Sequence, residues 1–128
     1  MNNAKQERVE TVNKIIKKIA SCSRGFFYTK SKDRYARMVI KNHKVFFVDD
    51  YTGEEVYAYN TVQNNKAGFS HGGTIWGLVN DFREFIVTGG YTNGKNGYGG
   101  LYCKHWGYDE SDMLEIQAYA KELGYLKR

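Results

Sequence analysis

The sequence contains no proline and only two cysteines, Cys22 and Cys103, among its 128 residues. Without proline, every turn has to rely on glycine, asparagine, aspartate or serine. Two cysteines are too few for a small secreted scaffold built on disulfides, and no Cys-x-x-Cys or Cys/His cluster has the spacing of structural zinc. We expect neither cysteine to form a disulfide.

Long apolar runs are also missing from the sequence. The N-terminus has no apolar stretch typical of a signal peptide, and no segment approaches the length of a membrane span. We therefore expect a reduced, cytoplasmic protein without a membrane partner. The length corresponds to one ordinary domain, so we expect residues 1–128 to fold as a single domain.

The chain has no acidic excess, because 19 lysines and arginines outnumber 14 acidic residues and give a formal net charge of +5. This balance argues against a protein that imitates DNA, which should be strongly acidic. A modest positive charge favours anionic partners, although a basic protein without such a partner is an equally open interpretation. What is abundant is aromatic residues, at 16% of the chain with eleven tyrosines.

Hydrophobic periodicity predicts an α+β fold. Apolar residues at three- and four-residue spacing indicate helices over residues 4–22 and 74–88, and a third helix beginning after Tyr108 with Asp109 or Ser111 as its N-cap. Between the first two helices, residues 26–60 read as an antiparallel meander of three to four strands, including one strand from Tyr35 to Ile40. We expect the two C-terminal helices to pack on this sheet.

A glycine-rich tract from Gly89 to Tyr108 has the most distinctive composition, with six glycines in its first twelve residues. Glycine lets a ligand approach the backbone closely. The tract also offers charge and flat aromatic faces, which suit a planar anion such as a nucleotide. An alternative is that Trp106 only anchors the tract on the core. The predicted ligand contacts in this tract are Lys95, Tyr98, Lys104, His105 and Trp106.

A second candidate segment precedes the middle helix, where the chain reads His71-Gly72-Gly73-Thr74. The first turn of a helix carries unpaired N–H groups that favour an anion, and two glycines can leave these groups accessible. The segment matches neither a P-loop nor a dinucleotide-binding fingerprint. The alternative interpretation is a simple loop in which Ser70 or Thr74 caps the helix.

The runs DDYTGEEVYAY, GFSHGGTIWGLVNDFREFIVTG and HWGYDESDM, within residues 49–113, resemble a group of small accessory proteins of tailed bacteriophages. The resemblance implies phage origin and expression inside a bacterium. It assigns no catalytic residue and no activity. Small accessory phage proteins often counter host defence or redirect host machinery, which is an analogy of context and not of a site.

Catalytic signatures are missing from the sequence. His43, His71 and His105 fall in three separate loops, and no nucleophile or metal motif is present. Arg34 and Arg37 stand among tyrosines, but three-residue spacing on one extended strand places them on opposite faces. We therefore expect no enzymatic activity and no cofactor.

Our leading hypothesis is a phage-encoded binding protein that sequesters a small anionic nucleotide signal of bacterial antiviral defence. A nucleic-acid-binding protein and a protein–protein inhibitor of a host defence enzyme are the alternatives. We also expect a homo-oligomer, most simply a dimer, because a chain of 128 residues has little internal volume and a subunit interface can enclose a pocket.

Overall fold

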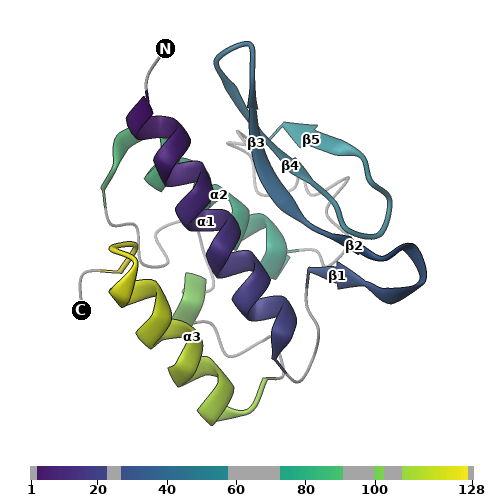
Figure 1. Ribbon diagram of the computed structural model, residues 1–128, viewed down its shortest axis with the longest axis vertical. Coiled ribbons are helices and arrows are strands. Elements are labelled where there is room, and N and C mark those ends of the chain that lie inside the picture. Colours follow the sequence, from purple (N-terminus) through teal and green to yellow (C-terminus); the bar gives the residue numbers. More distant parts are fainter. Residues whose placement is uncertain (1–2, 23–26, 58–72, 91–99, 103–107, 127–128) are drawn as a thin grey trace.

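A computed structural model gives the fold of the protein and describes residues 3–22, 27–57, 73–90, 100–102 and 108–126 (Figure 1). Three α-helices and five short strands confirm the α+β fold, and helices begin and end within one or two residues of the predicted bounds. In chain order the elements are α1 (Asn3–Ser21), β1 (Tyr28–Thr29), the 3-10 helix η1 (Lys30–Lys32), β2 (Arg34–Tyr35), β3 (Arg37–Lys41), β4 (Lys44–Val48), β5 (Glu55–Tyr57), α2 (Gly73–Thr88), the 3-10 helix η2 (Gly100–Tyr102) and α3 (Glu110–Glu122).

The strands form two antiparallel sheets, not one meander. β1 and β2 make a two-stranded ribbon, and β3, β4 and β5 make a three-stranded sheet in that order. The expected strand from Tyr35 to Ile40 is broken at Ala36, which lies between β2 and β3. Ala36 is buried and its N–H donates to the carbonyl of Phe27 at 2.8 Å. This bond extends the β1–β2 pairing by one residue, and from Arg37 onward the chain pairs with β4 instead. The sequence pattern does not mark this change of partner.

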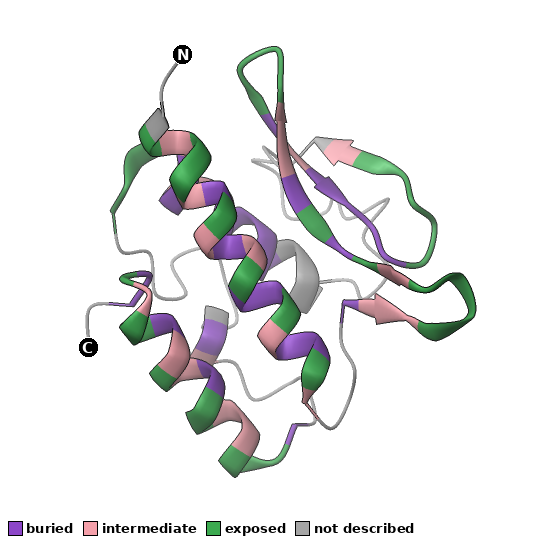
Figure 2. Cartoon of the chain, in the orientation of Figure 1, coloured by how far each residue is buried: buried purple, intermediate pink, exposed green. Residues whose placement is uncertain are grey.

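The core gathers around α1, which lies between the sheets and α3 with α2 behind it (Figure 1). Its apolar stripe is buried as predicted, while the residues between are exposed or half-buried (Figure 2). The strongest helix–sheet contact is made by α1 with β3, whereas α2 and α3 both pack against α1. The stripe residues are Val9, Val12, Ile15, Ile16, Ile19 and Ala20.

An asparagine side chain of α1 docks on the outer edge of the three-stranded sheet. Asn13 Nδ2 donates to the Met38 carbonyl at 3.0 Å, and the Met38 N–H donates to Asn13 Oδ1 at 2.7 Å. β3 is an edge strand, so these two backbone groups point away from β4. The Asn13 amide thus satisfies both groups and fixes α1 against the sheet.

Helix ends follow the sequence signals. Gly89 after α2 and Gly124 after α3 have φ values of 78° and 85°, the left-handed conformation that favours glycine. Asp109 occupies the N-cap position of α3, although its side chain makes no capping hydrogen bond. Within the described ranges, no helix has the length and apolarity needed to cross a membrane.

Candidate functional site

Most of the ligand contacts predicted from sequence lie outside the described residues. Only two of them fall inside, as the first two residues of α2, Gly73 and Thr74. An anion site at the start of α2 and in the glycine-rich tract therefore stays a prediction. The contacts outside the described residues are His71, Gly72, Lys95, Tyr98, Lys104, His105 and Trp106.

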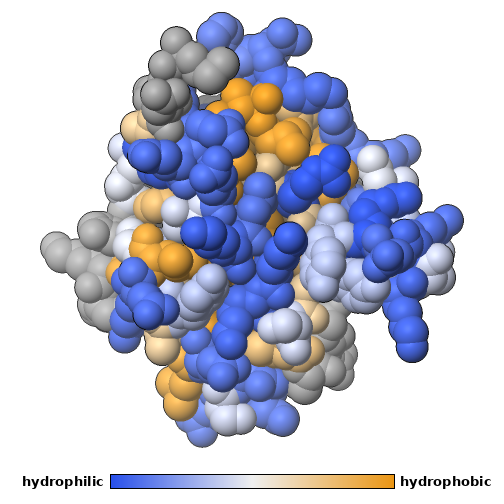
Figure 3. Space-filling model, in the orientation of Figure 1, coloured by the Kyte–Doolittle hydropathy of each residue, from blue (hydrophilic) through white to orange (hydrophobic). Residues whose placement is uncertain are grey.

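A different site opens between α1 and the junction of β2 and β3. Here a cleft of about 400 Å³ is lined by Asn13 and Lys17 from α1 and by residues 33–37, and we call it the basic cleft. Hydrophilic side chains cover the surface over α1 and over the β1–β2 ribbon (Figure 3). Three cationic side chains, of Lys17, Arg34 and Arg37, line the cleft with one carboxylate, that of Asp33.

The prediction that Arg34 and Arg37 lie on opposite faces is wrong, because both line this cleft. Alternation of faces holds along one continuous strand. The break at Ala36 places Arg34 in the ribbon and Arg37 in the three-stranded sheet, so alternation does not extend from one to the other. The two cations therefore contribute to the same site.

The Arg34 guanidinium is incompletely hydrogen-bonded. Its Nη1 atom is buried and has no hydrogen-bond partner. The guanidinium packs against Gly53 in the turn between β4 and β5, where a Cβ would stand 2.8 Å from Arg34 Cζ. A buried cationic N–H without an acceptor is costly. Arg34 also lines the cleft, where an oxyanion would add an acceptor for its guanidinium.

Tyr35 is the aromatic residue that lines the basic cleft, and it packs against Tyr28. The Tyr35 side chain is 42% exposed, and its ring centroid lies 4.6 Å from that of Tyr28. Lys17 Nζ lies 5.6 Å from the Tyr35 ring centroid, within the range of a cation–π interaction. The Tyr28 hydroxyl donates to Asp33 Oδ1 at 2.8 Å, and this bond is the main reason that the pKa of Tyr28 is raised.

The acidic residues at the β4–β5 turn have structural partners. Asp49 Oδ2 accepts hydrogen bonds from the Tyr51 N–H and from the N–H and hydroxyl of Thr52. Asp50 Oδ2 accepts from the Thr29 hydroxyl at 2.7 Å and so links the turn to the β1–β2 ribbon. Both carboxylates are buried, and they shape the turn that carries Gly53.

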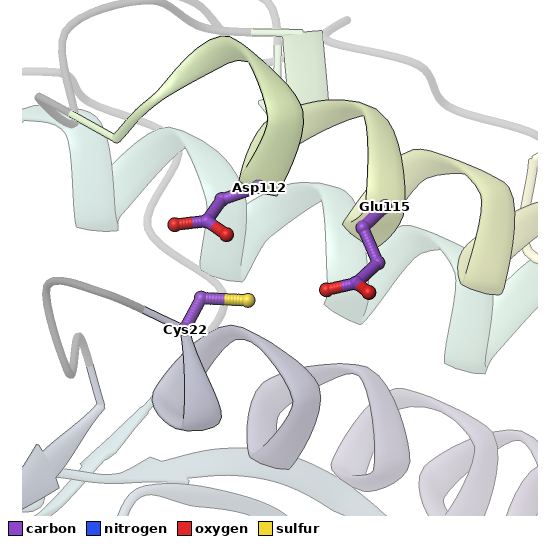
Figure 4. A group of neighbouring side chains, drawn as sticks. All are labelled: Cys22, Asp112 and Glu115. Atoms are coloured by element: carbon purple, nitrogen blue, oxygen red, sulfur yellow. The ribbon is translucent and has the colours of Figure 1, made fainter.

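A second cluster of reactive groups lies where the end of α1 meets α3 (Figure 4). The atoms of Cys22, Asp112 and Glu115 that could ligate a metal, one sulfur and two carboxylate oxygens, all lie within 4.8 Å of one another. Glu115 is paired with Lys18 Nζ at 3.2 Å, and the Cys22 thiol donates to the Lys18 carbonyl. The ammonium already balances part of the negative charge, so the cluster reads as an electrostatic contact between two helices.

The cysteine in this cluster is a free thiol, which confirms the expectation for Cys22, whereas Cys103 lies outside the described residues. Burial is the largest cause that raises the pKa of Cys22, and the Asp112 carboxylate raises it further, against the lowering effect of Lys18. A raised pKa leaves less thiolate at a given pH, and the thiolate is the reactive form. Cys22 should therefore be a slow nucleophile.

We expect iodoacetamide to alkylate Cys22 at pH 8 several-fold more slowly than it alkylates a free thiol peptide. Mass spectrometry of the Cys103→Ser variant, which retains one thiol, measures this rate. Adding Asp112→Asn should raise the rate, because one source of the raised pKa is removed. Glu122→Gln, at an exposed position of α3, is the matched control and should leave the rate unchanged. A rate equal to that of the peptide would contradict the assignment.

Comparison with known proteins places the chain in a family. The model of the YoqU family matches residues 2–128. The SPbeta prophage-derived uncharacterized protein YoqU of Bacillus subtilis (strain 168) is 44% identical over 126 residues, which cover 98% of this chain and 88% of that protein. No solved structure is significantly similar. A family match over nearly the whole chain, together with this prophage relative, shows that the protein is phage-derived and belongs to the YoqU family.

Proposed function

We propose that the protein binds a small anionic nucleotide in the basic cleft and sequesters it without converting it. The observation that carries the proposal is the convergence of Lys17, Arg34 and Arg37 on one cleft, in which the Arg34 guanidinium also keeps one nitrogen without a partner. A site with this arrangement attracts a phosphate-bearing ligand, because oxyanions supply acceptors to guanidinium and ammonium groups.

The cleft also has features that suit the rest of a nucleotide. Its volume of about 400 Å³ lies within the range of small-molecule sites. Tyr35, which is 42% exposed, offers a flat surface next to the cations. A base next to this ring and phosphates next to Arg34 would use both kinds of group, whereas a simple inorganic anion would use only the cations.

Phage origin gives this binding a role in the cell. Inside the host bacterium, a protein that holds a nucleotide tightly lowers its free concentration. If that nucleotide is a signal of antiviral defence, the phage protein delays the response of the host. The role requires no catalytic group, and the proposal is accordingly a non-enzymatic binder that acts in the cytoplasm, with a dimer enclosing the otherwise open cleft.

Calorimetric titration with cyclic and linear nucleotides tests the proposal. We expect Arg37→Ala to weaken nucleotide binding about 10- to 150-fold, because it removes a charge-assisted contact worth about 1.5–3 kcal/mol. Lys121→Ala, at an exposed position of α3, removes the same charge outside the cleft and should leave binding unchanged. Circular dichroism on each variant confirms that it is folded.

The remaining outcomes separate the alternatives. Nucleotide binding that Arg37→Ala, Lys17→Ala and Lys121→Ala all leave intact would place the site in the glycine-rich tract or near His71. Retardation of oligonucleotides that weakens steeply with salt would favour the nucleic-acid-binding alternative. Binding of neither ligand would favour the protein inhibitor. Sedimentation of the titrated samples tests the dimer, since a species of 14.8 kDa alone would contradict it.

A further inference from the structure

A single carboxylate, that of Asp33, stands among the cations that line the basic cleft. A site for a bare oxyanion gains nothing from a negative group, because the carboxylate repels the ligand. Neither the Lys18–Glu115 nor the Lys41–Glu55 salt bridge involves Asp33, and within the described residues Asp33 forms no salt bridge with a cation of the cleft. We therefore do not assign Asp33 the role of neutralising the cations of the cleft.

The position of Asp33 is fixed by its backbone and by a tyrosine. It follows η1 in the left-handed conformation, with φ of 48°, and its N–H donates to the Lys30 carbonyl at 3.1 Å. The Tyr28 hydroxyl holds Oδ1 at 2.8 Å. Among the described residues, no hydrogen bond reaches the second carboxylate oxygen. The cleft thus presents an oriented acceptor directly beside Arg34 in the chain.

We propose that Asp33 determines the specificity of the basic cleft by accepting a hydrogen bond from a neutral donor on the nucleotide, either a sugar hydroxyl or an exocyclic amine. This inference rests on the proposed nucleotide binding. A ligand that carries both phosphate and donor satisfies the cations and the carboxylate together. Pyrophosphate satisfies the cations but leaves the carboxylate unpaired and repelled, so it is rejected.

The test compares the dissociation constants of a bound nucleotide and of pyrophosphate, for wild type and for Asp33→Asn. Asparagine keeps the shape and tolerates the left-handed conformation, so the ribbon should be preserved. Asp33→Asn removes a negative charge that repels both anionic ligands, so both dissociation constants can change. The readout is therefore the ratio of the two dissociation constants. We expect the preference for nucleotide over pyrophosphate to fall about tenfold or more, a shift typical of a lost charge-assisted hydrogen bond.

Two further arms make the test specific. Titration with a ribonucleotide, its 2′-deoxy form and a form whose base lacks the amine identifies the group that donates a hydrogen bond to Asp33. Removing that group from the ligand should weaken binding to wild type as much as Asp33→Asn weakens binding of the intact nucleotide. Asp33→Gly, which also suits a positive φ, replaces Asp33→Asn if that variant misfolds. Glu122→Gln is the control for loss of one negative charge and should leave the ratio unchanged.

The possible failures are distinguishable. If wild type binds no nucleotide, the proposed function is wrong and this inference is wrong with it. If wild type binds nucleotide and the ratio does not change in Asp33→Asn or Asp33→Gly, only the specificity role of Asp33 is overturned. Improved pyrophosphate binding with nucleotide binding weakened or unchanged supports the inference.

Discussion

Replacing Phe82 with alanine should lower the free energy of unfolding by about 3–5 kcal/mol, the usual loss when a buried phenylalanine is truncated. Phe82 lies in the middle of α2 with none of its side chain exposed. Its ring centroid is 5.6 Å from that of Tyr125, and Tyr125 also contacts Phe85 at 4.9 Å. The truncation thus leaves a cavity where α2 meets the C-terminal segment.

Urea denaturation followed by circular dichroism measures this loss. Leu114→Ala is the matched control, because the Leu114 side chain on α3 is 58% exposed and its truncation creates no cavity. We expect the control to change stability by about 0.5 kcal/mol or less. A loss below about 1 kcal/mol for Phe82→Ala would mean that the buried face of α2 is wrongly assigned.

The second large effect should follow Asn13→Leu. Leucine has a similar size but cannot hydrogen bond, so the N–H and the carbonyl of Met38 both lose their partner. Each backbone group left unsatisfied costs about 1–3 kcal/mol, and the partial burial of these bonds favours the lower part of that range. We expect a total loss of about 2–4 kcal/mol in urea denaturation.

A matched control for this substitution lies on the same helix. Gln6→Leu also replaces an amide with leucine, but at an exposed position. It should change stability by about 0.5 kcal/mol or less. Hydrogen exchange of the Met38 amide gives an independent readout, because Asn13→Leu should accelerate it selectively. An equal effect of the two leucine variants would show that the Asn13–Met38 bonds contribute nothing to stability.

The helices could be predicted from the sequence because their signals are local. Apolar periodicity and terminal glycines such as Gly89 and Gly124 depend only on nearby residues. The division into two sheets could not be predicted, because residues 35–40 alternate as one strand would. At Ala36 the chain changes partner, from Phe27 to the strand β4, and the local pattern reveals neither partner.

The basic cleft was only partly visible in the sequence. Arg34 and Arg37 could be recognised as basic residues among tyrosines, but their common location depends on the break at Ala36. Asn13 and Lys17 are one helical turn apart on α1, which is typical of any polar helix face. Only the packing of α1 against β3 brings them to the cleft, and no spacing in the chain reports that packing.

The contact between Arg34 and Gly53 couples the residue types that the two positions can hold. At residue 53 the φ of 74° disfavours a side chain, and a Cβ there would also displace the nearby guanidinium. A larger residue at 53 would shift the Arg34 guanidinium, whereas a shorter residue at 34 would leave only the positive φ to favour glycine at 53. We therefore expect related phage proteins with arginine at the position of Arg34 to have glycine at the position of Gly53. Covariation of these two positions would then indicate which relatives keep the basic cleft.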